Sequence, residues 1–415
     1  MMKAVKCIIV LAMMLGWGSL SGQEFFSERI MGLRLIGATE AKIPVAEMDG
    51  RPITVEFDVN EEMPANYRVR VLHCDRDWKL TGTTFVNNET ANRAKVPIAY
   101  ELAPAGAQGY RFLYRFKLPG IAGIDRFAQS GNYLLEVLDE EWSRVLARGR
   151  FFVVERTVRP VLKITNRQLP SEIHPWNKVH RVEVGIVIPE NRGEGEPPLL
   201  APLLTRVDLI KNRQLYHPWR VDANEFSSTT FVEGFGTPKL KFIIENVQPG
   251  NEYRRIDLRS VNEYPEGMQL RPRNGADVSR TLQSAPKDNN GVAVLTTGSR
   301  YAGYVPFQFE LILDPPGSDS VIVVGDFNGW RPSGDYRLRY DEETRRYKAT
   351  VRLRRGFHDY QYTVGNDDWV SIEGNDWRTV GVYSAFVYYH DPRYGGFDRI
   401  VGFTQGMSSG GAGGF

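Results

Sequence analysis

Apolar and polar residues alternate over short runs along most of this chain, and this period of two is its most constraining feature. Successive side chains of a strand point to opposite faces, so each run predicts a strand with one buried face. Clear examples are residues 53–59, 67–71 and 347–353. Turn-forming clusters such as Met48-Asp49-Gly50 and Asp341-Glu342-Glu343 separate the runs. The pattern predicts an all-β protein whose strands stack as sandwiches.

Helical spacing of apolar residues does not extend beyond about ten residues anywhere after the first 22. Parallel α/β folds need helical crossovers between their strands, so this class is excluded. The length of 415 residues exceeds a usual domain of roughly 100 to 200 residues. We therefore expect tandem immunoglobulin-like β-sandwich domains.

Breaks in the strand pattern predict the domain boundaries. Arg159-Pro160 indicates a stiff joint after the first segment. Residues 273–298 are polar and rich in Asn, Asp, Ser and Gly, which is typical of a long loop or linker. The expected parts are a signal peptide at 1–22, an N-terminal sandwich at 27–157, a middle sandwich with its linker at 158–298, a C-terminal sandwich at 299–403 and a flexible Gly/Ser-rich tail at 404–415.

The first residues have the features of a secretory signal. Lys3 and Lys6 precede an apolar run at 7–20, and small residues follow it as a cleavage site. An uncleaved membrane anchor is the alternative interpretation, but Gly16 and Gly18 interrupt the run. No later stretch reaches the roughly 18 apolar residues that a membrane helix needs. We expect an exported chain that does not insert directly into a membrane.

The charge balance limits the possible partners, and the cysteine count limits the possible disulfide bonds. The 52 basic and 50 acidic residues leave a formal net charge of +2, so no overall field attracts nucleic acid or anionic lipid. Once the signal is removed, Cys74 is the only cysteine, and no intramolecular disulfide can form. Cys74 is then either a reactive thiol or a buried core residue.

The block His73-Cys74-Asp75 with Asp77 is the only close gathering of possible metal ligands in the sequence. Neighbours on a strand face opposite ways, so His73 and Cys74 cannot reach one ion without a sharp turn. We expect Asp75 and Asp77 to close the following turn and Trp78 to pack into the first core. Motifs of nucleophilic, phosphate-binding or zinc-dependent catalysis are missing from the sequence. The expectation is a protein with no catalytic residue, metal or cofactor.

The tripeptide His-Pro-Trp occurs twice in the second segment, as His174-Pro175-Trp176 and His217-Pro218-Trp219. The interpretation is that each copy is an aromatic plug at a strand end.

The run at 321–330 (VIVVGDFNGW), followed by strand patterns at 347–353 and 360–364, resembles the starch- and glycogen-binding modules of the early-set immunoglobulin-like type. In those modules two tryptophans and a lysine hold the sugar, whose apolar face stacks on the indoles. Trp330 and Trp369 occupy the tryptophan positions, and Gln361 stands at the lysine position. This resemblance implies, as an alternative function, a periplasmic glycan-binding protein using these three residues. The competing interpretation is that Trp330 fills the core and rim of an ordinary sandwich.

A second resemblance runs from about residue 31 to 403, and several sequence blocks carry it in one order. They are VLHCDRDW at 71–78, FAQSGNYLL at 127–135, RFFVVE at 150–155, GNEYRRID at 250–257, GDFNGW at 325–330 and YYHDP at 388–392. In these blocks the chain resembles the plug protein family of the bacterial type IX secretion system. Lys211-Asn212-Arg213 is a divergent version of the Gln-Asn-Gly-Arg stretch of that family's middle segment.

The resemblance implies a non-catalytic periplasmic protein, peripherally associated with the outer membrane. Its partner would be the outer-membrane translocon barrel, called SprA, whose periplasmic end it closes when no cargo is engaged. A barrel wide enough for folded proteins would otherwise leak. No motif identifies the residues of that interface.

Overall fold

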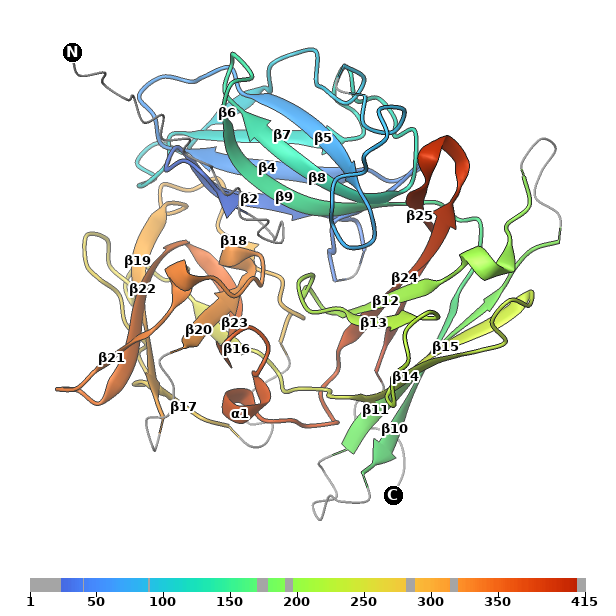
Figure 1. Cartoon of the computed structure of the whole chain (residues 1–415). Coiled ribbons are helices and arrows are strands. Elements are labelled where there is room, and N and C mark those ends of the chain that lie inside the picture. The colour runs from blue at the N-terminus through green and yellow to red at the C-terminus, as the bar shows by residue number, and fades with distance from the viewer. Residues whose placement is uncertain are drawn as a thin grey trace, which may run out of the picture.

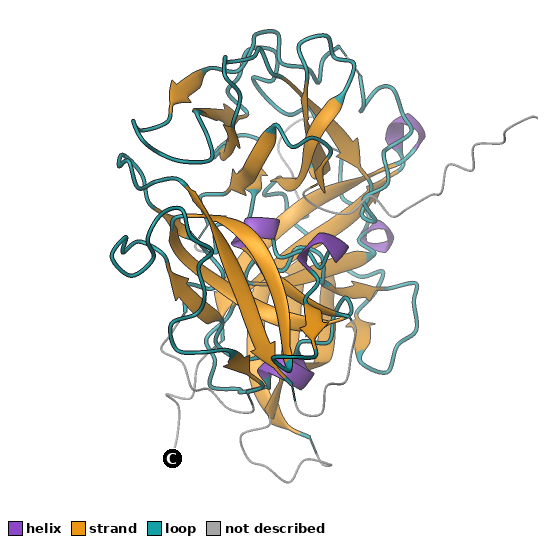
Figure 2. Ribbon diagram, turned by 90° about the vertical axis from the view of Figure 1, so that its left-hand side faces the viewer, coloured by secondary structure: helices purple, strands orange, loops and turns teal. Residues whose placement is uncertain are grey.

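A computed structural model describes residues 24–39, 41–88, 90–169, 178–190, 197–280, 288–313 and 320–408. The chain folds into three two-sheet sandwiches that pack against one another (Figure 1). Helices within the described residues are single turns, and the longest, α1 (Val370–Glu373), is too short to span a bilayer. Figure 2 shows these turns scattered among the strands and loops. The expected all-β sandwich fold is confirmed. The predicted signal peptide and the first His-Pro-Trp copy lie outside the described residues.

The first sandwich spans residues 24–155. One sheet has the order β1-β9-β8-β5, with β3 added in parallel beside β9, and the other has the order β2-β4-β7-β6. The strands are β1 (Glu24–Phe25), β2 (Ile30–Ile36), β3 (Val45–Glu47), β4 (Ile53–Val59), β5 (Arg68–Cys74), β6 (Tyr100–Leu102), β7 (Phe112–Leu118), β8 (Gly131–Leu138) and β9 (Val145–Val154). The alternation at 53–59 places Ile53, Val55 and Phe57 in the core, where Phe57 stacks on Tyr114 at 4.9 Å.

The second sandwich packs the sheet β10-β11-β15-β14 on the sheet β13-β12-β24-β25. Its strands are β10 (Val161–Gln168), β11 (Lys178–Val187), β12 (Arg206–Lys211), β13 (Trp219–Asp222), β14 (Thr230–Glu233), β15 (Lys239–Val247), β24 (Val382–Asp391) and β25 (Phe397–Met407), with the short turn η1 (Ala201–Leu203). Residues Val184, Val207, Phe242 and Tyr383 fill the space between the sheets.

The third sandwich spans residues 254–373. One sheet has the order β16-β23-β18, with β20 also paired to β23, and the other has the order β17-β19-β22-β21. The elements are β16 (Arg254–Asp257), β17 (Asp277–Val278), β18 (Val294–Leu295), β19 (Tyr304–Ile312), β20 (Val321–Gly325), η2 (Asp326–Asn328), η3 (Gly334–Tyr336), β21 (Arg339–Asp341), β22 (Arg346–Arg354), β23 (Gly356–Val364) and α1. Its core includes Phe307, Phe309, Tyr360 and Tyr362.

The sheets follow different bounds from the expected segments 158–298 and 299–403. β24 pairs with β12 from Arg206↔Tyr388 to Lys211↔Tyr383, so the end of the chain completes the second sandwich. The third sandwich is therefore inserted between β15 and β24. The polar stretch at 273–298, expected as a linker, contributes β17 and β18 to the third sandwich. Residues 404–407, expected in the flexible tail, belong to β25.

This insertion predicts how fragments of the chain fold. A fragment of residues 250–375 contains every strand of the third sandwich and is expected to show β-type circular dichroism and cooperative thermal unfolding. A fragment of residues 299–403 lacks β16 and β18, two of the three strands paired with β23, and β12, which pairs with β24, so it is expected to stay unfolded. Cooperative unfolding of the 299–403 fragment alone would contradict the inserted arrangement.

Candidate functional site

The block at 73–77 forms a turn at the end of β5. His73 lies 2.7 Å through Nδ1 from Thr81 Oγ1 and 3.1 Å through Nε2 from the Ser130 carbonyl oxygen. Cys74 is buried, and burial raises the pKa of its thiol to about 12. Asp75 Oδ1 accepts the backbone N–H groups of Asp77 and Lys79, which confirms its predicted turn-closing role. Among the residues in the described ranges, no three or more His, Cys, Asp or Glu side chains are grouped to hold a metal.

The sequence predicted that Trp78 packs into the core of the first sandwich, and this prediction is wrong. Trp78 packs instead in an apolar cluster that the first and second sandwiches share. We call this contact the first joint; its cluster includes Cys74, Trp78, Phe152, Ile210, Phe386, Tyr388 and Ile400. Phe152 of β9 stacks on Phe386 of β24 at 4.2 Å, and Trp78 meets Phe152 edge-on at 5.3 Å. The outer face of β9 is thus a second buried face, which period-two alternation alone does not reveal.

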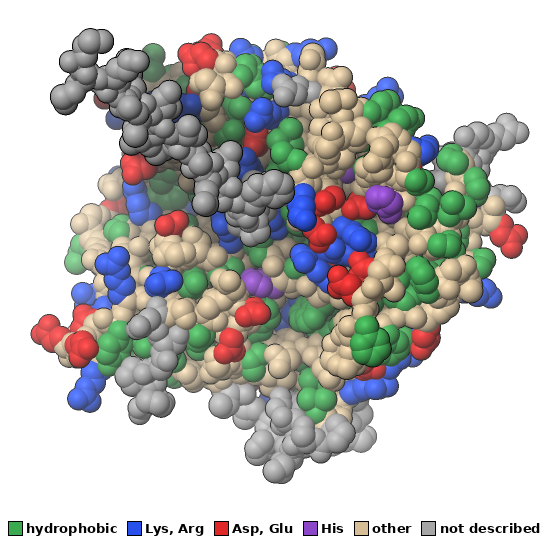
Figure 3. Space-filling view, in the orientation of Figure 1, with side chains coloured by type: hydrophobic (Ala, Val, Ile, Leu, Met, Phe, Trp, Pro, Cys, Tyr) green, Lys and Arg blue, Asp and Glu red, His purple; other side chains and the backbone are tan. Residues whose placement is uncertain are grey.

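Ion pairs surround the apolar centre of the first joint. Arg399 of β25 contacts Glu155 at 2.6 Å, and Arg206 of β12 contacts Asp77 at 2.7 Å. Figure 3 shows side chains of both charges gathered where the upper sandwich meets the right-hand one. Because the charges alternate in sign, they fix the register of the two bodies without creating a net field.

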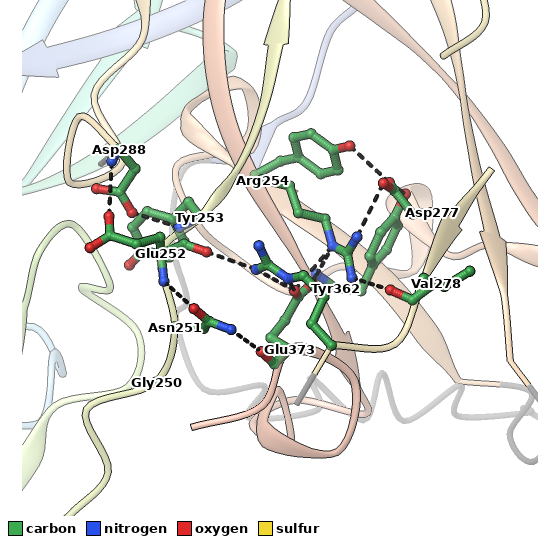
Figure 4. Close-up of polar contacts among 12 residues, drawn as sticks. Gly250, Asn251, Glu252, Tyr253, Arg254, Asp277, Val278, Asp288, Tyr362 and Glu373 are labelled. Carbon is green, nitrogen blue, oxygen red and sulfur yellow. Dashed lines mark hydrogen bonds and ion pairs between the residues drawn. The ribbon is translucent and has the colours of Figure 1, made fainter. Parts of the chain in front are cut away.

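The second joint connects the second and third sandwiches, where the chain crosses twice, at residues 248–253 and 374–381. The two crossings are hydrogen-bonded to each other: Gly250 N–H donates to Asn375 Oδ1 (2.8 Å), and Asp376 N–H donates to the Gly250 carbonyl (2.7 Å). Gly250 has a φ of 72°, a conformation that favours glycine. Asn251 Nδ2 also donates to the Glu373 carbonyl at 3.0 Å (Figure 4).

A single buried carboxylate anchors the third sandwich at this joint. Glu373, which is 1% exposed, accepts from Arg254 Nε at 3.0 Å and from Arg280 Nη2 at 2.7 Å. The Tyr362 N–H donates to the same carboxylate at 2.8 Å. Arg254 extends the network to Asp277 at 3.1 Å (Figure 4). α1 and β16 are thereby fixed to β23.

The third joint connects the first and third sandwiches. Arg354 of β22 forms an ion pair with Asp58 of β4 at 3.0 Å, and both side chains are almost fully buried. Tyr304 donates its hydroxyl to Asp58 at 2.8 Å, and Arg354 reaches the Tyr110 hydroxyl at 2.9 Å. Each pair of sandwiches therefore has its own buried contact.

All three sandwiches meet at the divergent stretch Lys211-Asn212-Arg213. Arg213 donates to the Lys42 carbonyl of the first sandwich at 2.5 Å and pairs with Asp326 of the third at 3.1 Å. Asn212 bridges Val382 N–H and the Tyr253 hydroxyl. Lys211 Nζ donates to the Pro249 carbonyl, and burial lowers the pKa of Lys211 to about 8. Arg213 of this stretch therefore contacts both other sandwiches at the meeting point.

The structure does not form the sugar clamp proposed from Trp330, Trp369 and Gln361. Trp330 is 1% exposed because Tyr253 covers its ring at 4.3 Å, and its Nε1–H donates to the Gly291 carbonyl at 3.0 Å. Gln361 is likewise buried within β23. Neither offers a surface to a sugar, so the interpretation of Trp330 as a core residue is the one that the geometry supports.

Trp369 lies elsewhere, at a surface cleft of about 460 Å³ between the second and third sandwiches. The residues lining this cleft, which we call the aromatic cleft, are Tyr216, His217, Pro218, Trp219, Arg220, Asn246, Gln248, Asp367 and Trp369. The edge of His217 meets Trp369 at 5.6 Å. The sequence motif His217-Pro218-Trp219 indicates no site by itself, because only the insertion brings Trp369 beside it.

A comparison with known protein families finds a match for the first sandwich. Residues 30–155, which make up nearly all of the first sandwich, match the family model described as type 9 secretion system plug protein 1st domain. This part of the chain is similar to the first domain of type IX secretion plug proteins. The resemblance carried by the blocks at 71–78, 127–135 and 150–155 is thereby confirmed over that domain.

Solved structures extend the comparison to the fold of the whole chain. A crystal structure of a hypothetical protein from Parabacteroides merdae superposes with a TM-score of 0.71 at 19% identity, covering 93% of this chain and 99% of that one. The two proteins share the fold. A bacterial ice-binding adhesin aligns at 11% identity over 91% of this chain and 96% of its own, but its TM-score is 0.15. No curated protein matches significantly.

The blocks that resemble the plug family gather at the joints. The first joint contains residues from the blocks at 71–78, 127–135, 150–155 and 388–392. The second joint and the meeting point contain residues from 250–257 and 325–330. Residues of these blocks thus hold the sandwiches together.

Replacing Glu373 with Gln tests the second joint. The variant keeps the size of the side chain but leaves Arg254 and Arg280 buried without their shared charge, so we expect a loss of about 3 to 5 kcal/mol in the free energy of unfolding. Urea titration followed by circular dichroism measures it. The control is Glu343→Gln on the exposed turn after β21, expected to change stability by less than about 0.5 kcal/mol. Equal stability of the two variants would show that the carboxylate does not anchor the joint.

Acid sensitivity tests the burial of His73. Burial lowers the pKa of His73 from 6.5 to about 4. Between these pH values the unfolded chain binds more protons than the folded one, so stability present above pH 6.5 is lost as the pH falls toward 4. The loss is expected to reach about 3 kcal/mol for this residue. In urea titrations at pH 7 and pH 5, His73→Gln is expected to show a smaller decrease in the free energy of unfolding than the wild type. The same decrease in both proteins would exclude this role for His73.

Proposed function

We propose that this protein is a non-catalytic plug that binds the periplasmic end of the type IX secretion translocon, an SprA-like outer-membrane barrel, and closes its pore when no cargo is engaged. The observation that carries the proposal is the match of the first sandwich to the plug family together with three joints that unite the sandwiches. The signal-like first residues and the family together support a periplasmic location beside the outer membrane.

A plug works by shape, and the joints explain how this chain keeps its shape. Tandem domains on flexible linkers move relative to one another and would not seal an opening. Here the second and third sandwiches are linked by two crossings that are bonded together, and the first sandwich is tied to both by buried ion pairs and stacked rings. Such a body can present a fixed surface to a barrel rim.

Release from the pore requires no reaction. Cargo or another subunit that binds the same surface shifts the population from bound to free plug, provided that it discriminates between the two states. The proposed role therefore needs a complementary surface and no convergence of ionisable groups in a pocket.

Deleting the gene tests the proposal in the cell. Loss of the protein is expected to raise entry of a large hydrophilic antibiotic such as vancomycin, and wild-type protein restored in trans should lower it again. An affinity-tagged copy is expected to co-purify with the translocon barrel from detergent-solubilised membranes. Unchanged permeability in the deletion strain, or purification without the barrel, would count against the plug.

A matched pair of variants connects this phenotype to the joints. Arg213→Ala removes the contact common to the three sandwiches and is expected to restore the permeability barrier less well than Arg126→Ala, which alters an exposed loop. Both should accumulate to the same level in the periplasm, as checked by immunoblot. Equal restoration by the two variants would mean that the shape of the body does not limit plugging.

A further inference from the structure

The aromatic cleft is the surface feature that the plug proposal does not use. Three separate segments build it: the turn after β12 and the start of β13, the end of β15, and the turn that leads into α1. Two of these segments belong to the second sandwich and one to the third. The second joint holds the walls in place, because the crossing that follows Gln248 is hydrogen-bonded at Gly250 to the crossing that returns from the third sandwich. We infer that this cleft binds a short, uncharged oligosaccharide.

Two aromatic rings of the lining supply the first part of the recognition chemistry. Trp219 and Trp369 are both partly exposed, unlike Trp330, and they come from different sandwiches. The ring centroid of Trp219 lies 6.3 Å from that of Tyr383, and Trp369 and His217 are arranged edge-to-face, so each indole has an aromatic neighbour. The apolar C–H face of a pyranose ring can stack on such an indole.

Polar groups supply the second part. Asn246 and Gln248 are exposed at the end of β15, and their amide groups have no hydrogen-bond partner among the residues that the structure describes. Asp367 offers carboxylate oxygens and Arg220 offers guanidinium donors. Sugar hydroxyls both donate and accept, so they can satisfy this mixed set of groups at once.

The net charge of the cleft limits the charge of the ligand that it can bind. One guanidinium and one carboxylate offset each other, so the lining attracts neither an anion such as a phosphate nor a cation. A proline-rich peptide could also stack on the rings, but it lacks most backbone N–H donors and would leave the acceptor oxygens of Asp367 and Asn246 unmatched. The volume of about 460 Å³ falls within the usual range for small-ligand sites.

Binding of neutral sugars by the purified mature protein tests the inference. The probes are maltotriose, cellotriose and chitotriose, followed by isothermal titration calorimetry and by quenching of tryptophan fluorescence. At least one probe is expected to give saturable binding. No saturable signal with any probe, or saturable binding of a polyproline peptide in place of the sugars, would overturn the inference.

Variants locate the binding to the cleft. Trp369→Ala is expected to weaken binding by about tenfold, because it removes a stacking surface. Gln248→Ala changes an exposed side chain that poses no risk to folding, and it is expected to weaken binding severalfold. Phe226→Ala, which removes a fully exposed aromatic side chain of the same sandwich, is the control and should bind as the wild type does. Unchanged affinity in both cleft variants would overturn the assignment.

Two further probes separate the sources of such a sugar in the periplasm. Chitohexaose, an uncharged analogue of the peptidoglycan glycan strand, and a neutral hexose oligosaccharide from the outer part of the lipopolysaccharide core are titrated in parallel, and competition by the bound trisaccharide should displace whichever binds. A signal that the trisaccharide does not displace would count against the cleft as the binding site. Co-purification with the translocon is an independent measurement, so failure of sugar binding leaves the plug proposal intact.

Discussion

Two arginines share one buried carboxylate at the point where the chain returns from the third sandwich to the second, and the inserted sandwich depends on this contact to hold its two ends together. Glu373, at the end of the sandwich, accepts from Arg254 of β16 at its start and from Arg280 of the segment after β17. The two chain crossings leave from these ends and are hydrogen-bonded to each other through Gly250, Asn375 and Asp376. A domain attached by two crossings without such contacts would be free to move relative to its neighbour.

A buried ion pair between two domains adds little net stability, so its main contribution is to select one orientation of the domains. Desolvation of both charges offsets much of their attraction, so apolar contacts would give equal or better stability. Charged pairs, however, penalise every arrangement in which a partner is missing. The joints of this protein combine the two: stacked rings such as Phe152 with Phe386 supply burial, and pairs such as Asp58 with Arg354 select one orientation. For a proposed plug, one defined shape matters more than extra stability.

The proposed plug and the proposed sugar site use different properties of the same architecture. Closing a pore would use the outer surface of the three joined sandwiches. The aromatic cleft, in contrast, exists only because the second and third sandwiches meet at a fixed angle. Trp219 and Trp369 would not share a site if the third sandwich pivoted. The same joint therefore supports both proposals while leaving them independent to test.

The class of fold and much of the local structure follow from the sequence alone. Alternation placed Ile53, Val55 and Phe57 in a core, and Asp75 was correctly predicted to close a turn, because both depend on neighbours a few residues away. The blocks resembling the plug family predicted the identity of the first domain, but nothing local indicated that they form joints. Four features became evident only in the folded molecule: β24 completes the second sandwich, Trp78 packs between two sandwiches, Tyr253 covers Trp330, and Trp369 meets His217. A strand pattern states which face is buried but not which distant strand or sheet covers it, since pairing partners more than a hundred residues apart leave no periodic signal in either segment.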